Sequence, residues 1–468
     1  MKRSSPVLHA DDIRLKGTTS FCPHCRVKVP ADVVKRPAGK SDEVWLVKNC
    51  QVCGIKEVKI SSDARFYWLS QGQREVEPSA CGAGCGCANP AAGGRIGFLG
   101  NNALRPLPLT NPVEVMSTCL ALIEIVDSCN LSCPTCFADS PHGAGEKVDA
   151  VPLEELKERI QGVIDRKGKI EILQLSGGEP TLHPRFFELV RWCQENPEID
   201  YVLVNSNGVR LAKDEIFARE LGDLIHYGHF QFYLQYDGPG REAEKKLRGA
   251  NLGDLKIRAI ERAGELGIPM TLAMTVIPEN LNHLWETVEF GLKYDHVRGV
   301  AFQPMFGSGR TFGDSPGDRQ LNTADIILGL VEQSKGGASF DDFTPLPCGD
   351  PNCATIGYLL KLEGEIRSIS DFVDFGTLQG FLSDRVRYRL EDLIKCGCES
   401  EPLGKLLHEL ELDERNTFRL FIKPFMDGED WDEDRIDRCC THVIRPDGKL
   451  DSFCRYYLNG GAIAYRRS

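Results

Sequence analysis

The stretch VDSCNLSCPTCFA, residues 126–138, decides how this sequence is interpreted, because it places Cys129, Cys133 and Cys136 in a CxxxCxxC spacing. It directly follows an apolar run, CLALIEIV at 119–126, that reads as a β-strand. Three thiolates on one short loop can hold three irons of a [4Fe–4S] cube and leave the fourth iron open, whereas a fully ligated cluster mainly carries electrons. The spacing therefore predicts a ligand-binding iron–sulfur site, with a zinc site as the alternative.

Strand-like and helix-like segments alternate from this motif onward. Apolar runs typical of strands occupy residues 119–126, 169–175, 200–205, 229–236, 269–276 and 300–305. Helical periodicity occupies about 153–164, 184–195, 213–221, 253–266 and 283–294, and a further helix is predicted over 322–335 with Asn322 or Thr323 as its N-cap. Such alternation implies an α/β fold with a parallel sheet, either an open doubly wound sheet or an incomplete (β/α)6 barrel.

A second motif, LSGGEPTLHP, places Gly177, Gly178, Glu179 and Pro180 directly after the second predicted strand. Paired glycines let the backbone approach a ligand closely, and a carboxylate can accept hydrogen bonds from an ammonium group. The next two strands also end in polar residues, namely Ser206, Asn207, Gln235 and Asp237. Polar residues at the C-terminal ends of successive parallel strands are typical of a barrel active site, although NG and DG pairs also form ordinary turns.

Cysteine is unusually frequent, with 19 residues in tight groups. Close spacing without a secretion signal favours metal ligation over disulfides. The knuckles FCPHC and NCQVC predict one tetrahedral zinc or iron ion held by Cys22, Cys25, Cys50 and Cys53.

Two further sets are predicted to hold auxiliary clusters. The first set is Cys81, Cys85, Cys87 and Cys119, and the second is Cys348, Cys353, Cys440 and Cys454. We prefer Cys440 to the adjacent Cys439, although the sequence does not separate them. Cys396 and Cys398 are alternative ligands, and Cys193 fits the apolar face of a helix as a core residue.

Composition narrows the class of protein. Lys and Arg number 56 against 68 Asp and Glu, a net charge of −12 in 468 residues, which argues against nonspecific nucleic-acid binding. No apolar run is long enough to span a bilayer, and the N-terminus lacks a secretory signal. We therefore expect a cytoplasmic protein, with peripheral membrane contact and the oligomeric state left open. The acidic run GEDWDED at 428–434 is expected to be a solvated loop.

The CxxxCxxC motif followed by GGEP resembles the radical S-adenosylmethionine (SAM) superfamily, whose fold is an incomplete (β/α)6 barrel. The resemblance implies that Cys129, Cys133 and Cys136 form the catalytic cluster. It also implies that SAM is bound by Phe137, Gly177, Gly178, Glu179, Pro180, Ser206, Asn207, Gln235 and Asp237. In the superfamily the residue before the last cysteine is often aromatic; here it is Thr135, and Phe137 follows instead.

Over nearly the whole chain, the sequence resembles the tetraether lipid synthase family. The resemblance is carried by the CPxC and CxxC knuckles, LQLSGGEPTLHP, PCGDPNC and the segment FIKPFMD…RCCTHVIRPDGKLDSFC. It implies a rubredoxin-like or zinc-ribbon module at 1–70, an auxiliary cluster region at 71–118, a barrel at 119–310 and a C-terminal cluster-binding extension at 311–468.

The same resemblance implies an enzyme with one SAM-binding and two auxiliary [4Fe–4S] clusters, reduced by a donor such as ferredoxin or flavodoxin. A 5′-deoxyadenosyl radical would take hydrogen from an unactivated carbon, and two alkyl chains of lipids would be joined by a C–C bond. The alternatives are methyl transfer to a pterin-like heterocycle and, from another class, a non-catalytic iron–sulfur electron carrier. The sequence does not identify the substrate.

Overall fold

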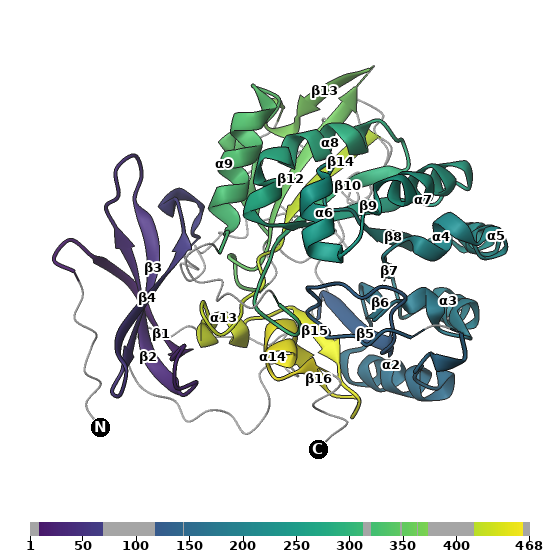
Figure 1. The fold of residues 1–468 in the computed structure, drawn as a ribbon, viewed down its shortest axis with the longest axis horizontal. Helices are drawn as coiled ribbons and strands as arrows, with labels where there is room; N and C mark the ends of the chain where they lie inside the picture. The colour runs from purple at the N-terminus through teal and green to yellow at the C-terminus, as the bar shows by residue number, and fades with distance from the viewer. Residues whose placement is uncertain are drawn as a thin grey trace, which may run out of the picture.

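Six parallel strands form the centre of the main sheet, as the alternating sequence pattern predicts (Figure 1). They are β5 (Leu120–Val126), β6 (Leu173–Gly177), β7 (Val202–Ser206), β8 (Phe230–Gln235), β9 (Met270–Val276) and β10 (Val297–Pro304). Neighbours in sequence are neighbours in the sheet, and each pair is parallel. The computed structural model describes residues 9–68, 118–143, 145–311, 320–346, 349–362, 364–372 and 416–461.

Helices connect these strands and pack on the outer face of the sheet. They are α2 (Leu153–Lys167), α3 (Phe186–Glu195), α4 (Val209–Lys213), α5 (Glu215–Asp223), α6 (Arg241–Arg248), α7 (Gly253–Glu265) and α8 (Leu284–Leu292). Helix α9 (Thr323–Ser334) begins at the predicted N-cap, since the Asn322 side chain accepts hydrogen bonds from the backbone N–H groups of Ala324 and Asp325. Among the described residues, no helix is long and apolar enough to cross a bilayer.

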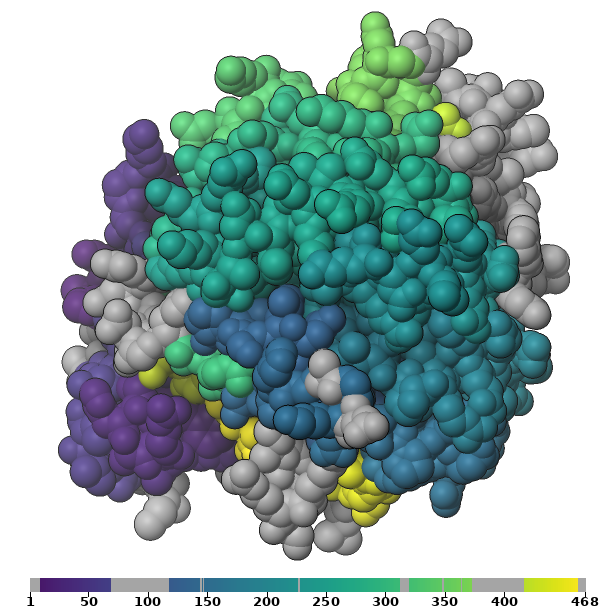
Figure 2. Space-filling model, turned by 45° about the vertical axis from the view of Figure 1, so that its right-hand side comes forward, coloured from purple at the N-terminus to yellow at the C-terminus, as the bar shows by residue number. Residues whose placement is uncertain are grey.

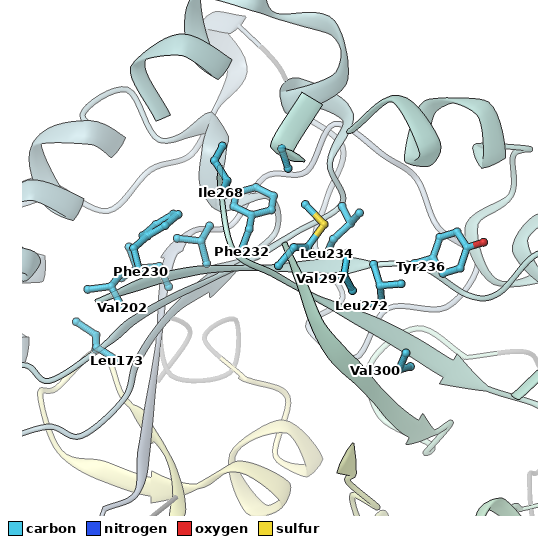
Figure 3. Close-up of a cluster of buried hydrophobic side chains, with 14 of the residues drawn as sticks. Leu173, Val202, Phe230, Phe232, Leu234, Tyr236, Ile268, Leu272, Val297 and Val300 are labelled. Atoms are coloured by element: carbon cyan, nitrogen blue, oxygen red, sulfur yellow. The ribbon is translucent and has the colours of Figure 1, made fainter. Parts of the chain in front are cut away.

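Side chains alternate between the two faces of the central strands. Apolar residues such as Leu173, Val202, Phe230 and Phe232 are buried against the helices (Figure 3). Cys193 of α3 is fully buried in the same core, so its prediction as a core residue is confirmed. The residues between the apolar ones are mostly polar and face the inside of the sheet, as period-two alternation requires.

The C-terminal region extends this sheet at both edges. Strand β14 (Thr417–Ile422) pairs parallel with β10, and β15 (Thr441–Ile444) pairs parallel with β5. The remaining elements of the region are β11 (Thr344–Pro345), β12 (Thr355–Leu362), β13 (Glu365–Ser368), α13 (Glu433–Asp437), β16 (Leu450–Ser452) and α14 (Phe453–Leu458). The Nζ of Lys423 donates to the Oγ1 of Thr441 at 2.9 Å, so a hydrogen bond links the β14 edge to the β15 edge. The predicted six-stranded α/β core is thus confirmed, and C-terminal strands flank it.

The N-terminal module is a separate four-stranded antiparallel sheet. Its strands are β1 (Ile13–Phe21), β2 (Lys28–Arg36), β3 (Glu43–Cys50) and β4 (Gly54–Ser61). A small core of Ala31, Val33, Val44, Leu46 and Val58 holds it together. Cys22 and Cys25 follow β1, and Cys50 and Cys53 lie at the turn between β3 and β4.

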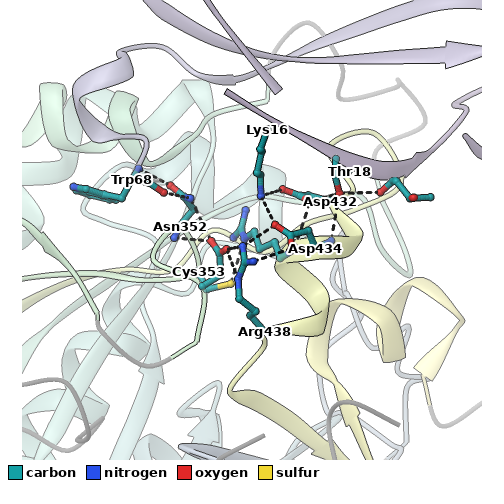
Figure 4. A network of polar contacts seen from close by, with 11 residues as sticks. Lys16, Thr18, Trp68, Asn352, Cys353, Asp432, Asp434 and Arg438 are labelled. Atoms are coloured by element: carbon teal, nitrogen blue, oxygen red, sulfur yellow. Dashed lines mark hydrogen bonds and ion pairs between the residues drawn. The ribbon is translucent and has the colours of Figure 1, made fainter. Parts of the chain in front are cut away.

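The acidic run at 428–434 is not a solvated loop, contrary to our prediction. Trp431 is 1% exposed, and its ring packs on Phe21 of the N-terminal module at 5.3 Å between centroids. Lys16 Nζ lies 2.7 Å from Asp432 and 3.0 Å from Asp434 (Figure 4). The prediction failed because lysines of the distant N-terminal module supply the opposite charge that lets carboxylates be buried. The C-terminal segment, yellow in Figure 2, accordingly lies between the purple module and the blue first half of the core.

Candidate active site

The cysteine loop leaves the C-terminal end of β5 and is held by backbone hydrogen bonds at both ends. Cys129 N donates to Pro141 O at 2.9 Å, and Cys136 exchanges a pair of hydrogen bonds with Arg310 at 2.8 and 2.9 Å. The Arg310 side chain also donates from Nε to Cys133 O at 3.0 Å. Arg310, which sequence reasoning missed, thus ties the loop to the segment after β10.

The GGEP turn packs directly against this loop. Gly178 N donates to Val126 O at 2.8 Å, and Glu179 N donates to Ser128 O at 3.0 Å. A Cβ at Gly177 would lie 2.1 Å from Val126 O, and a Cβ at Gly178 would lie 2.1 Å from Ser128 O. Both glycines are therefore required for the two motifs to approach each other.

Glu179 is 1% exposed and joins the ends of β6 and β7. Its Oε1 accepts from Ser206 Oγ at 2.8 Å and from the hydroxyl and backbone N–H of Thr181 at 2.7 and 3.2 Å. Its Oε2 accepts from Asn207 N at 2.8 Å. Burial raises the pKa of Glu179, whereas these four hydrogen bonds favour the charged carboxylate. The Glu179 side chain therefore organises the strand ends, and its predicted contact with the SAM ammonium group stays a prediction.

Asn207 connects this carboxylate to the cysteine loop. Its Nδ2 donates to Asn130 Oδ1 at 2.7 Å and lies 3.8 Å from Cys129 Sγ. Its carbonyl accepts from Lys256 Nζ at 2.6 Å. Lys256 is buried, which lowers its pKa to about 8. Lys256 belongs to no motif in the sequence, and its position on α7 did not indicate a contact with the site.

A buried ion pair lies on the other side of the loop. Asp237 accepts from Arg248 Nε at 2.6 Å and Nη2 at 2.8 Å, and also from Thr275 N at 3.0 Å. The Arg248 guanidinium also hydrogen-bonds the Cys133 side chain, and Gln235 lies beside it with its carboxamide 3.0 Å from Nη1. Arg248 ends a helix with several exposed basic residues, so the sequence carried no signal for its role.

Thr135 and Phe137 take different roles in the loop. Thr135 Oγ1 donates to Leu247 O at 3.2 Å, which anchors the loop to α6. The Phe137 ring packs against Tyr457 and Phe453 of α14, at 4.8 and 5.5 Å between centroids. Phe137 thus links the cysteine loop to the C-terminal region, and its contact with SAM stays a prediction.

The three loop cysteines suit a multi-iron cluster better than a single ion. Within the described residues, only Cys22, Cys25, Cys50 and Cys53 form a group whose ligand atoms all lie within 4.8 Å, as one tetrahedral ion requires. The loop thiols are spread more widely and meet N–H donors, such as Leu131 N at 3.4 Å from Cys129 Sγ. Burial raises the pKa of Cys129 to about 12, so cluster iron must offset the deprotonation.

The structure describes only some of the cysteines that are candidate ligands of the auxiliary clusters. Cys81, Cys85, Cys87, Cys348, Cys396 and Cys398 lie outside the described residues. Cys353, Cys439 and Cys454 interact electrostatically, and burial raises the pKa of Cys439 and of Cys454 to about 12. Cys440 lines the central cavity with Cys119, whose N–H donates to Cys440 O at 3.1 Å, and the Cys440 thiol lies beside Gly349. The preference for Cys440 in the third set therefore stays a prediction, with Cys439 beside Cys353 and Cys454.

A cavity of about 190 Å³ occupies the inner face of the sheet. Its polar wall consists of Gln174, Tyr201, Asn205, Gln231, Tyr233, Thr271 and Gln303 from the central strands, with Arg298, Arg419, Lys423 and Thr441 nearer the edges. Its apolar wall includes Leu120, Leu122, Phe421, Phe425 and Phe453. Sequence reasoning missed the polar wall, although the polar residues between apolar ones in LQL, FQFYLQ and AFQ were its signal.

Comparisons with known proteins agree with this geometry. The family model of the radical SAM superfamily matches residues 123–291, and that of the HMPTM N-terminal zinc ribbon domain matches residues 14–62. The 7,8-dihydro-6-hydroxymethylpterin dimethyltransferase of Methanocaldococcus jannaschii is 24% identical, over 94% of this chain and 93% of the relative. A GTP 3′,8-cyclase of Vibrio cholerae is 28% identical over 35% of this chain and 46% of the relative.

Among solved structures, Streptococcus suis SuiB bound to S-adenosylmethionine aligns with a TM-score of 0.36 at 15% identity, covering 47% of this chain and 45% of that one. The family matches coincide with the two parts of the fold that carry the clustered cysteines, the loop after β5 and the N-terminal knuckles. This chain therefore carries a radical SAM superfamily domain preceded by a zinc ribbon.

Proposed function

We propose that this radical SAM enzyme methylates a carbon of a nitrogen-rich fused heterocycle of the pterin class. The observation that carries the proposal is the polar inner face of the barrel, where Gln174, Asn205, Gln231 and Gln303 line the cavity. Among the described residues, the amides of Gln174 and Asn205 have no hydrogen-bond partner, and an amide left without one costs about 1–3 kcal/mol, so an alkyl chain beside these two would be disfavoured. A heterocycle with ring nitrogens, a carbonyl and an amino group offers those amides their partners.

The relative that matches most of this chain supports the same substrate class, since it is named a dihydrohydroxymethylpterin dimethyltransferase and aligns over 94% of the chain. When bound, the cluster and SAM supply a radical able to break an unactivated C–H bond, given one electron from a reductant such as ferredoxin or flavodoxin. In the net exchange, the substrate C–H hydrogen atom would end in 5′-deoxyadenosine and a methyl carbon would take its place. The sulfonium donor of that methyl group would become a thioether on taking up a second electron from the same reductant.

The residues of the chain position these reactants. Cys129, Cys133 and Cys136 would hold the cluster, with Arg248 and Asn207 as hydrogen-bond donors beside two of the sulfurs. The Glu179 network keeps the ends of β6 and β7 in register next to the loop. The stacked rings of Phe425 and Phe453, with centroids 4.1 Å apart, both line the cavity and make this part of its wall apolar.

Joining of alkyl chains, the function expected from the family resemblance, is the second candidate. The apolar wall of the cavity favours it, because Leu120, Leu122, Phe421 and Phe425 could pack along a hydrocarbon. Leu120 and Leu122 of this wall lie on β5, the strand that ends at the cysteine loop, and Phe421 lies on β14, whereas the amides of the polar wall lie on β6, β7, β8 and β10.

The test is an anaerobic incubation of cluster-loaded protein with SAM and dithionite. One arm contains 6-hydroxymethyl-7,8-dihydropterin, and the other contains vesicles of dialkyl glycerol lipid. Mass spectrometry should find a methylated pterin in the first arm, with 5′-deoxyadenosine released. Coupled alkyl chains in the second arm alone would refute methyl transfer in favour of lipid joining. No 5′-deoxyadenosine in either arm would point to an electron carrier.

A further inference from the structure

The amide side chains of the polar wall are not equivalent. Gln303 donates from Nε2 to the Tyr233 hydroxyl at 3.0 Å, and Gln231 donates to Thr271 and lies within reach of the Tyr201 hydroxyl. These two amides are therefore already engaged by the protein. In the described part of the chain, the side chains of Gln174 and Asn205 have no hydrogen-bond partner, and both line the cavity.

Gln174 and Asn205 lie on adjacent parallel strands. Gln174 of β6 pairs in register with Leu203 of β7, and Asn205 is two residues further along β7 on the same face. A strand rise of about 3.3 Å per residue and a strand spacing of about 4.8 Å separate their Cα atoms by roughly 8 Å. Two carboxamides at this separation can both reach one edge of a planar bicyclic ring.

The pair also lies close to the site of the chemistry. Asn205 is followed by Ser206, which donates to Glu179, and by Asn207, which reaches Cys129. A ring held by Gln174 and Asn205 would therefore sit just inside the barrel from the cysteine loop and the GGEP turn. An alkyl chain could form no hydrogen bond with these two amides, whereas a planar heterocycle bonded to both would be held in one orientation.

We propose that Gln174 and Asn205 are the specificity-determining pair that recognises the lactam and amino edge of the heterocycle. Each carboxamide offers one acceptor and two donors, which complement a ring carbonyl, a ring N–H and an exocyclic amino group. Asn and Gln recognise the donor–acceptor edge of adenine through the same complementarity. This inference rests on the proposed function, because it concerns how the pterin-class substrate is bound.

The test measures binding rather than turnover. Cluster-loaded parent, Gln174→Leu and Asn205→Leu proteins are equilibrated anaerobically with 6-hydroxymethyl-7,8-dihydropterin and with 6-hydroxymethylpteridine, which lacks the carbonyl and the amino group. Because an unpaired polar group in a complex costs roughly 1–3 kcal/mol, each substitution should weaken pterin binding about tenfold to a hundredfold and leave pteridine binding almost unchanged. The parent's preference for the pterin should therefore nearly disappear.

The matched control is Gln161→Leu on α2. Its amide donates to Asp165 at 2.9 Å and to no other residue of the described ranges, and the variant should bind the pterin like the parent. Iron content and circular dichroism verify that the cavity variants are folded and loaded. If the parent binds the pterin and both cavity variants bind it equally well, the inference is overturned and the proposed function survives. If the parent binds no pterin, both fail together.

Discussion

Replacing Glu179 with glutamine tests whether its carboxylate organises the active site. The change keeps the shape of the side chain but exchanges one acceptor oxygen for an NH2 group. The two backbone donors, Thr181 N and Asn207 N, cannot rotate away, and they contact different oxygens of the carboxylate. A glutamine therefore leaves one buried N–H facing another donor.

One unsatisfied buried donor costs about 1–3 kcal/mol. For a cooperative unit of 150–250 residues this lowers the melting temperature by about 2–12 °C. Glu179→Ala would leave all four donors unpaired and should be more destabilising still. Because Asn207 contacts both Glu179 and the cysteine loop, SAM affinity should also fall roughly tenfold or more in the glutamine variant.

The assay is a thermal melt of cluster-loaded protein followed by circular dichroism, together with calorimetric SAM titration. Glu188→Gln is the matched control, since Glu188 is exposed on α3 and, within the described residues, forms its ion pair with Arg185 at the surface. We expect the control to melt and bind SAM like the parent. If Glu179→Gln does the same, the network does not organise the site and the reasoning is refuted.

Three further predictions follow from the geometry. Cys133→Ala should abolish 5′-deoxyadenosine formation in a chromatographic assay, whereas the control Cys193→Ala, at a core position of α3, should still form it. Formation of 5′-deoxyadenosine by the Cys133→Ala variant would exclude Cys133 as a cluster ligand. Lys16→Met should lower the free energy of unfolding by about 1–3 kcal/mol in denaturant melts, because it leaves the buried carboxylate of Asp432 poorly paired. Lys28 is half-exposed, so Lys28→Met should cost less than about 1 kcal/mol, and equal effects of the two changes would contradict a stabilising role for the Lys16–Asp432 ion pair. Burial lowers the pKa of His442 from 6.5 to about 4, so only the unfolded chain gains this proton between those values. The contribution of His442 to the free energy of unfolding should be constant above pH 6.5 and fall by about 3 kcal/mol toward pH 4, and melts of His442→Gln should lack this part of the fall.

Much of the fold was predictable because its signals are local. The apolar alternation of each central strand and the periodicity of each helix are contained in fewer than twenty residues. The candidate metal ligands are local as well: Cys129, Cys133 and Cys136 share one loop, and the four cysteines of the ribbon lie in two close pairs. The GGEP turn lies beside the cysteine loop because consecutive parallel strands end at the same edge of the sheet.

The remainder of the site depends on residues that are far apart in the chain. Arg248, Lys256 and Arg310 contact the predicted ligands from α6, α7 and the segment after β10, and no spacing links them to the motifs. The burial of Trp431 in an acidic run required lysines some 400 residues earlier, as in the hydrogen bond of Lys16 to Asp434 across 418 positions.

The sequence by itself identified the radical SAM motifs of this protein, because the spacing of the three cysteines and the paired glycines of the GGEP turn are each contained in one short loop. Only the tertiary structure formed the cavity in which we propose that the substrate binds. In the sequence, no spacing or motif links Gln174 with Asn205. They line the same cavity only because β6 and β7 lie side by side with their apolar residues facing the helices. Burial, pairing and cavity shape arise from contacts between distant segments, which folding creates and residue order alone does not display.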